Sequence, residues 1–251
     1  MTTGPGPGVA GARRMVVLDI DDTLYLERDY VRSGFAAVGR WACPELGITD
    51  FGERAWALFE AGVQGTIFDE ALAACGVAPV PAGLVARLVE VYRAHAPEIV
   101  LQDDARAWLD TVGGGSIGAH VVVAVLTDGP LASQRAKAEA LGLARWADPI
   151  VFTEALGPGR GKPHPAAFEL LEREIGLGGD RCVYVADNPA KDFAGPHGLG
   201  WRTVRIRRPG GLHVSVPSTG DVNIEITTFA DLDATLDAAR PDRGAGGRGA
   251  A

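Results

Sequence analysis

Three carboxylic acids stand within four positions of this chain, directly after a short apolar run. The run is Met15 to Leu18, and the acids are Asp19, Asp21 and Asp22. Like charges this close repel one another, and the end of a buried strand is a poor place for them. A hard dication such as Mg²⁺ would offset the repulsion, because it binds one or two carboxylates together with a substrate phosphate and water. The spacing therefore indicates a cation-assisted site, where a carboxylate could attack a phosphate ester as a covalent nucleophile.

Two further apolar runs end in polar residues in the same way. The run at 121–126 is followed by Thr127 and Asp128, and the run at 181–185 leads to Asp187. In open α/β sheets the ligand crevice lies beyond the carboxyl ends of the strands. The polar ends of the three runs are therefore expected to meet at one site.

The elements that would position these residues alternate along the chain. Buried parallel strands are predicted at the apolar runs 16–18, 121–126, 181–185 and 203–206. Helical patterns lie between the later runs, at 131–143 and 165–175. Strands that alternate with helices indicate βαβ units, so the predicted fold is α/β, with a Rossmann-like, doubly wound parallel sheet as its core.

The region 25–104 differs in character from the rest of the chain. It has no comparable apolar run, its apolar residues recur at helical spacing, and glycines and prolines divide it into about four helices. This pattern predicts an inserted α-helical cap between two parts of the core, 14–24 and 105–240. The Gly- and Pro-rich ends, 1–13 and 241–251, are expected to be a disordered leader and tail.

Composition and net charge argue against several classes of protein. The 251 residues carry a formal net charge of −8, which argues against non-specific binding to nucleic acid. The basic run from Arg202 to Arg208 alternates with apolar residues and is expected to be a solvated strand edge. No apolar run approaches the roughly 20 residues that span a bilayer. Three cysteines are too few for a disulfide framework, so buried free thiols in a reducing cytoplasm are expected.

Four short motifs, in order along the chain, resemble those of the haloacid dehalogenase (HAD) superfamily. One such motif would be weak, but four in the expected order are specific, and the resemblance covers about residues 14 to 238. It implies a helical cap between the first two motifs and relatives of the phosphoglycolate phosphatase-like and 5′-nucleotidase-like kind. The motifs are D-x-D-x-T at 19–23, Leu126-Thr127-Asp128, Gly161-Lys162-Pro163, and the stretch from Val185 to Asp192.

By this resemblance, Asp19 would attack phosphorus and form an aspartyl-phosphate. Asp21 would protonate the leaving alcohol and then activate water, and a neighbouring anion would help to keep it protonated, since like charges raise a carboxyl pKa. Asp19, Asp187 and the backbone carbonyl of Asp21 would hold Mg²⁺ as the cofactor.

The resemblance also implies supporting roles. Thr127 would donate its hydroxyl to a phosphate oxygen, and Lys162 would neutralise the phosphate as a point charge. Asp192 and Asn188 would orient metal-bound water or Lys162 from behind. Asp128, next to Thr127, is a candidate for phosphate binding, or alternatively for the N-cap of the following helix.

Other polar and aromatic residues near these motifs have simpler interpretations. Asp22 is expected to hydrogen-bond within its own loop, since aspartate favours such turns. His164 is expected to be structural or to face solvent. Tyr25 and Tyr30, next to the connection with the cap, are candidates for substrate contact, although aromatics at helical spacing belong more often to the core.

Asp21 decides among the reactions of the superfamily. Its dehalogenases lack this second aspartate and need no metal, so dehalogenation is not expected. A phosphomutase stays open as an alternative, although those enzymes tend to have valine where Thr23 stands; a non-catalytic binding domain is the third alternative. The expected function is Mg²⁺-dependent hydrolysis of a small phosphorylated metabolite, a sugar phosphate or nucleoside monophosphate. The protein would be a cytoplasmic monomer or homodimer with no nucleic-acid or membrane partner.

Overall fold

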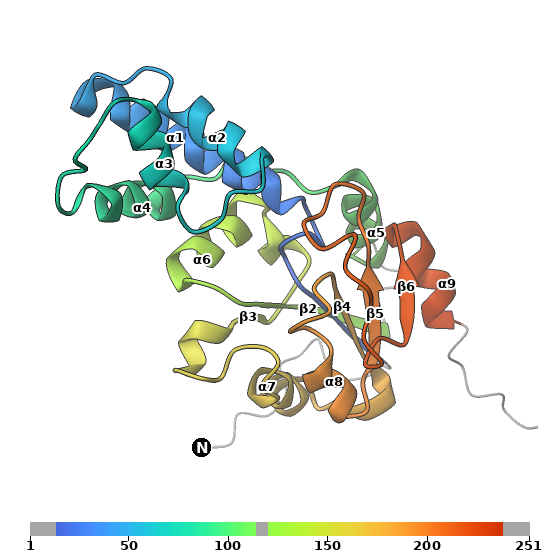
Figure 1. The fold of residues 1–251 in the computed structure, drawn as a ribbon. Coiled ribbons are helices and arrows are strands. Elements are labelled where there is room, and N and C mark those ends of the chain that lie inside the picture. The colour runs from blue at the N-terminus through green and yellow to red at the C-terminus, as the bar shows by residue number, and fades with distance from the viewer. Residues whose placement is uncertain (1–13, 114–119, 238–251) are drawn as a thin grey trace, which may run out of the picture.

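The computed structural model describes residues 14–113 and 120–237. Within these residues, six strands form one sheet in the order β3-β2-β1-β4-β5-β6, and every neighbouring pair is parallel (Figure 1). The strands are β1 Arg14–Leu18, β2 Val121–Thr127, β3 Ile150–Phe152, β4 Cys182–Ala186, β5 Arg202–Ile206 and β6 Ile224–Ile226. This is the predicted Rossmann-like α/β sheet. The sequence pattern does not reveal β3 and β6, because each has only three residues.

Helices cover both faces of the sheet, which explains why the central strands are apolar throughout. Val16 and Leu18 of β1 pack on one face, in a cluster with residues of α5 and α9, whereas Met15 and Val17 pack on the other face with residues of α7. The core helices are α5 Asp103–Gly113, α6 Leu131–Ala140, α7 Ala166–Ile175, α8 Ala194–Gly198 and α9 Leu232–Asp237. The helix predicted at 131–143 ends at Ala140, because Gly142 is left-handed and a short 3₁₀ turn follows.

Four helices lie between β1 and α5, and together they form what we call the four-helix segment. They are α1 Glu27–Leu46, α2 Phe51–Glu60, α3 Ile67–Ala74 and α4 Leu84–Ala94. Their apolar side chains pack in a cluster of their own, separate from the two clusters of the sheet, and Figure 1 shows the four helices gathered at one side of the molecule. Phe35 is buried in this cluster, and the partly buried Phe59 and Phe68 pack against it.

The chain passes from the sheet to the four-helix segment and back, and these two connections lie side by side. The backbone N–H of Gln102, where the chain returns, donates to the carbonyl of Leu24, where it leaves, at 2.9 Å. A second contact joins the segment to α6, since the hydroxyl of Ser133 donates to the carbonyl of Arg93 at 3.3 Å. These bonds place the end of α4 above the start of α6, beside the carboxyl ends of the strands.

The expectation of a solvated strand edge at Arg202–Arg208 is wrong. β5 lies between β4 and β6, so it is an interior strand. Arg205 is 0% exposed and Arg208 is 6% exposed. The Arg205 guanidinium donates to the backbone carbonyls of Asp187 at 2.9 Å and of His213 at 2.8 Å. A charge pattern alone could not reveal these partners, because Asp187 lies after β4 and His213 lies in the loop after β5.

Two other expectations concern the cysteines and the ends of the chain. All three cysteines are free, but only Cys182 is buried; Cys75 is partly exposed and Cys43 is exposed, so the expectation of three buried thiols is wrong. The predicted leader, 1–13, and the predicted tail, 241–251, both lie outside the described residues. Among those described, no helix is both long and apolar enough to cross a membrane.

Candidate active site

The three predicted polar strand ends meet at one edge of the sheet. Asp19 directly follows β1, Thr127 is the last residue of β2, and Asp187 directly follows β4. β1 lies between β2 and β4, and all three strands run parallel, so their carboxyl ends reach the same edge. All three residues are buried, with Asp187, the most exposed of them, at 7%.

We call the buried residues at this edge, Asp19, Thr127, Lys162, Asp187 and Asp192, the floor of the site. Lys162 lies among the carboxylates of the floor. Its Nζ is 3.1 Å from Asp19 Oδ1 and 2.8 Å from Asp192 Oδ1, and it donates to the Tyr184 hydroxyl at 3.0 Å. Burial by itself would lower the pKa of Lys162, but the charges of Asp19 and Asp192 outweigh it and hold the pKa well above the usual range. Lys162 is therefore a permanent cation that fixes the position of Asp19.

Asp128 holds the loop that carries Lys162. Its carboxylate accepts the backbone N–H of Lys162, at 3.1 and 3.2 Å to the two oxygens, and the hydroxyl of Thr153. The N-cap position of α6 is Pro130, and the N–H of Leu131 at the start of the helix donates to Glu154, so the N-cap alternative for Asp128 is wrong. Asp128 also lines the cavity at this site, and phosphate binding by Asp128 stays a prediction.

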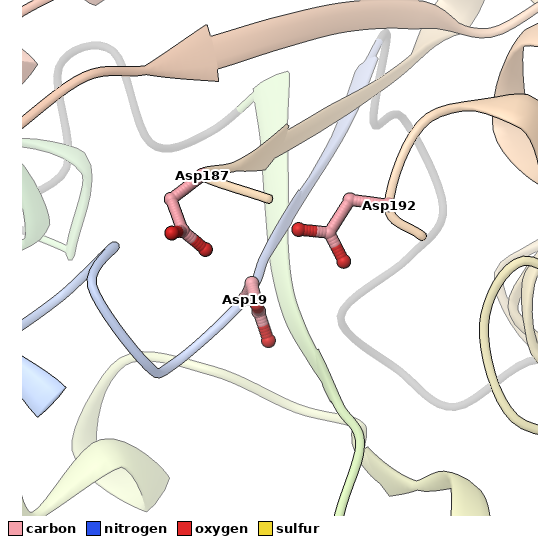
Figure 2. A group of neighbouring side chains, drawn as sticks. All are labelled: Asp19, Asp187 and Asp192. Atoms are coloured by element: carbon pink, nitrogen blue, oxygen red, sulfur yellow. The ribbon is translucent and has the colours of Figure 1, made fainter. Parts of the chain in front are cut away.

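Asp19, Asp187 and Asp192 form a compact acidic cluster, in which one oxygen of each lies within 4.8 Å of the others. Figure 2 shows Asp187 and Asp192 on either side of Asp19. Burial, followed by the charges of Asp19 and Asp192, raises the pKa of Asp187 to about 9. Burial also raises the pKa of Asp19 to about 6, although Lys162 opposes the shift.

These oxygens fit a divalent cation. Lys162 already pairs with Asp19 and Asp192. Asp187, by contrast, has neither an ion-pair partner nor a hydrogen-bond donor for its carboxylate among the residues described. A hard cation such as Mg²⁺, which prefers oxygen ligands, would supply that missing partner, and Asp187 and Asp19 would hold it.

Asp21 lies in a set of donors that the sequence does not predict. Its Oδ1 accepts the Tyr25 hydroxyl at 2.5 Å and lies 2.7 Å from Lys137 Nζ, while its Oδ2 accepts Gln134 Nε2 at 3.1 Å. Burial would raise the pKa of Asp21, but the charge of Lys137 and the hydrogen bonds from Lys137, Tyr25 and Gln134 together outweigh it and lower the pKa. The expectation that neighbouring anions keep Asp21 protonated is therefore wrong for the protein without substrate.

Gln134 and Lys137 are the functional candidates that sequence reasoning missed. They are three positions apart on α6, so they share the helix face that meets the site. Gln134 also accepts the hydroxyl of Thr127 at 3.0 Å. A signal existed, because α6 starts four residues after the polar end of β2, and buried polar residues on the first turns of such a helix face the crevice.

The two tyrosine candidates have different positions. Tyr25 is 0% exposed and its hydroxyl is bonded to Asp21, so the expectation of substrate contact is wrong for Tyr25. Tyr30 lines the cavity above the site, and its ring centroid is 4.1 Å from Lys137 Nζ. Near the connection to the four-helix segment, Tyr25 therefore supports Asp21, whereas Tyr30 faces the cavity.

Asp22 is confirmed as a residue of loop structure. Its backbone is left-handed, with φ of 49°, a conformation that aspartate tolerates better than most residues. Its carboxylate accepts the backbone N–H of Glu27 at 2.8 Å and of Leu212 at 2.7 Å. Asp22 therefore joins the start of α1 to the loop after β5. His164 is exposed and accepts the N–H of Ala166 at 3.1 Å, as a structural residue would.

Asn188 and Asp192 support the floor from the loop after β4. Asp192 Oδ2 accepts the backbone N–H of Asn188 at 2.8 Å, while its Oδ1 pairs with Lys162. The side-chain amide of Asn188 lies 3.0 Å from Nε2 of His213. Of the two alternatives for Asp192, contact with Lys162 is the one found here.

A cavity of about 290 Å³ opens above the floor, at the lower end of the range for small-molecule sites. Residues of the sheet edge, of α6 and of the four-helix segment all line it. Arg93 and Lys191 contribute positive charge to its wall, and neither has an ion-pair partner among the described residues. The wall residues are Glu27, Tyr30, Tyr92, Arg93, Ser133, Gln134, Lys137, Asn188, Lys191 and His213.

The sequence of residues 14–200 matches the haloacid dehalogenase-like hydrolase family. This match covers well over half of the chain, and the protein belongs to that family of hydrolases. The motifs at the strand ends and the parallel sheet agree with this membership.

Curated relatives include several phosphatases. The chain is 28% identical over 179 residues to a phosphoserine phosphatase of Thermus thermophilus, a match that covers 71% of this chain and 61% of the relative. It is 31% identical over 121 residues to enolase-phosphatase E1 of Streptomyces avermitilis, covering 44% of this chain and 49% of the relative. The matched part thus spans about half to three fifths of the length of these two relatives.

Solved structures of low sequence identity share the fold. YfnB of Bacillus subtilis, named as a candidate HAD-hydrolase and solved with bound magnesium, superposes with a TM-score of 0.61 at 18% identity, covering 90% of this chain and 99% of that one. A Thermotoga maritima protein named as a candidate β-phosphoglucomutase superposes with a TM-score of 0.61 at 15% identity, covering 90% and 100%. At such identities the likeness concerns the fold alone.

Proposed function

We propose that this protein is a Mg²⁺-dependent phosphomonoesterase that hydrolyses a small phosphorylated metabolite through an aspartyl-phosphate. One observation carries the proposal: Asp19, paired with a buried lysine, and Asp21, two residues on, line one cavity beside the acidic cluster. The names of the curated phosphatases support the class of reaction, and the cavity volume supports a substrate of the size of a sugar phosphate or nucleoside monophosphate.

Asp19 is the proposed nucleophile. Lys162 holds Asp19 Oδ1 in place and balances part of the phosphate charge, so nucleophile and phosphate can approach one another. Mg²⁺, held by Asp19, Asp187 and the carbonyl of Asp21, would stabilise the charge that develops on the phosphate oxygens. The Thr127 hydroxyl would turn from Gln134 to a phosphate oxygen, because that hydroxyl has a single proton to donate.

Asp21 is the proposed acid and base. It would protonate the leaving oxygen as Asp19 attacks, and then take a proton from the water that hydrolyses the aspartyl-phosphate. A dianionic phosphate beside Asp21 opposes the effect of Lys137 and raises the pKa of Asp21, which favours the proton that the first step needs.

The four-helix segment, which occupies most of residues 25–104, is proposed to act as a cap. It contributes Glu27, Tyr30, Tyr92 and Arg93 to the wall, opposite the strand ends. A cap in this position would exclude water from the phosphate and select the leaving group.

The test is phosphate release from p-nitrophenyl phosphate, measured with Mg²⁺ and with excess chelator. The wild type is expected to release phosphate only with the metal, and Asp19→Asn to release essentially none while it retains its circular dichroism spectrum. Asp180→Asn, an exposed acid in a turn before β4, is the matched control and should keep full activity. The phosphomutase alternative would replace the proposal if the wild type released no phosphate but interconverted sugar phosphates in the presence of a bisphosphate.

A further inference from the structure

The side chain of Asp21 is held asymmetrically by its donors. Oδ1 receives two of them, the Tyr25 hydroxyl and the Lys137 ammonium, whereas Oδ2 receives only Gln134 Nε2 among the described residues. A carboxylate oxygen offers about two lone-pair positions. Oδ1 is therefore fully used by the protein, and Oδ2 keeps one position for a group in the cavity.

The burial and the contacts of Lys137 favour its pairing with Asp21. It is 3% exposed, and within the described chain Asp21 is its one ion-pair partner. The aromatic face of Tyr30 lies 4.1 Å from its Nζ, which adds a cation–π contact. A buried ammonium is stable only when it is paired, and its attraction for an anion is strong where water is excluded. Lys137 and Asp21 therefore hold one another in a single orientation.

Gln134 connects this orientation to the phosphate site. Its Nε2 donates to Asp21 Oδ2, while its Oε1 accepts the hydroxyl of Thr127. Gly129 lets the loop before α6 approach this amide, since a Cβ at position 129 would lie 2.8 Å from Gln134 Nε2. The residue expected to bind the phosphate and the residue expected to move the proton are thus joined by one side chain.

We propose that Lys137 and Gln134 are positioning residues that direct one oxygen of Asp21, Oδ2, at the ester bond to be broken. This inference rests on the proposed function. In the first step the bond from Asp19 to phosphorus forms, the bond to the leaving oxygen breaks, and the Oδ2 proton passes to that oxygen. In the second step water bonds to phosphorus, the bond to Asp19 breaks, and a proton of the water returns to Oδ2.

The inference predicts an effect that depends on the leaving group. Benzyl phosphate releases a poor leaving group, an alkoxide that needs the proton, whereas p-nitrophenyl phosphate has similar size and releases a stable phenolate that does not. The ratio kcat/KM reports the steps up to departure of the leaving group, so hydrolysis of the aspartyl-phosphate does not enter the comparison. A misplaced acid therefore penalises benzyl phosphate selectively.

The experiment measures kcat/KM for both esters with Mg²⁺ in the wild type and in Lys137→Met. We expect the variant to lose about 10²-fold on benzyl phosphate, the lower end of what general acid catalysis contributes, and to change little on p-nitrophenyl phosphate. Both esters are measured on the same preparation, so the ratio of the two values does not depend on the fraction of folded enzyme. Gln134→Leu provides a second variant with the same expected direction, should Lys137→Met not fold.

Three controls define the outcome. Asp21→Asn sets the full effect of losing the proton donor, and adding Lys137→Met to it should not change the ratio further, since both act through one group. Lys137→Arg keeps the cation and is expected to recover most of the loss. Arg135→Met alters an exposed cation on the same helix and should leave the ratio unchanged.

Equal losses on both esters in Lys137→Met and Gln134→Leu would overturn the inference, because a purely structural role lowers both values together. In that case the wild type still hydrolyses both esters and the proposed function stands. If the wild type hydrolysed neither, the proposed function would fail first, and the inference with it.

Discussion

The floor of the cavity and its wall differ in how their charges are paired. At the floor, Lys162 lies within 3.1 Å of both Asp19 and Asp192, and all three are nearly inaccessible to solvent. On the wall, Arg93 is exposed and Lys191 is partly exposed, and neither has an ion-pair partner in the described parts of the chain.

The cost of removing charge from water explains this difference. A buried ion is stable only with partners in good geometry, so the floor residues must be arranged by the fold before any ligand arrives. An exposed ion keeps its hydration, so it needs no protein partner before a ligand binds. The paired, buried charges therefore determine the reaction, whereas the unpaired wall cations Arg93 and Lys191 are free to vary with the substrate.

The largest effect on stability is expected from Lys162→Met, at the floor. Removal of the cation leaves the buried carboxylates of Asp19 and Asp192 without a compensating charge, so the free energy of unfolding should fall by about 3–5 kcal/mol, and phosphate release should cease. Urea unfolding monitored by tryptophan fluorescence measures the first effect. An unchanged unfolding midpoint would break the comparison, because it would mean that the floor charges are as independent as those of the wall.

The next effect concerns the acidic cluster. Mg²⁺ added to metal-free protein at 100 times its dissociation constant should stabilise the fold by about 2.7 kcal/mol, seen as a rise in melting temperature. In Asp187→Asn this rise should be lost or strongly reduced, since the carboxylate without a protein partner is then gone. An equal rise in the variant would place the cation elsewhere.

A smaller effect is expected at a pair of intermediate burial. Asp104 accepts both contacts from Arg208 at 3.0 Å and the backbone N–H of Phe229 at 2.8 Å. Burial would raise the pKa of Asp104, but the bond from Phe229 and the charge of Arg208 outweigh it and lower the pKa. Asp104→Asn should therefore destabilise the protein by about 1–3 kcal/mol at neutral pH.

The pH dependence of that difference follows from the sign of the shift. Because the pKa of Asp104 is lower in the folded protein, its contribution is present above the unfolded value, near pH 4, and is lost as the pH falls through the folded value. Urea midpoints of wild type and Asp104→Asn should therefore converge as the pH falls below the unfolded value of about 4. A difference that stayed constant from pH 7 to pH 3 would assign the effect to packing rather than to charge.

The smallest effect on stability is expected on the wall. Arg93→Gln removes an exposed charge, so the free energy of unfolding should change by no more than about 0.5 kcal/mol. For a substrate with a second anionic group, KM should rise while kcat is kept, and p-nitrophenyl phosphate, which has no such group, should be unaffected. A fall in kcat with every ester would make Arg93 part of the floor chemistry and remove the distinction.

Much of the floor could be predicted from sequence, for a local reason. Asp19, Thr127 and Asp187 each end a continuous apolar run, and parallel strands place such ends at one edge. The loop role of Asp22 could also be predicted from sequence, because turn preferences act within a few residues. The errors lie where partners are distant in sequence: Asp21 meets Lys137 across 116 positions, and Arg208 meets Thr23 across 185.

The sequence by itself determined the class of sheet, the order of the motifs and the residues at the strand ends, because apolar periodicity and strand polarity are local properties of the chain. Only the tertiary structure decided the surroundings of those residues. It buried Arg205 of β5 beneath the loop that follows this strand, turned Tyr25 toward Asp21 and placed Lys137 beside it. The physical reason is that the pKa and orientation of a side chain depend on groups a few ångströms away, whichever part of the chain supplies them.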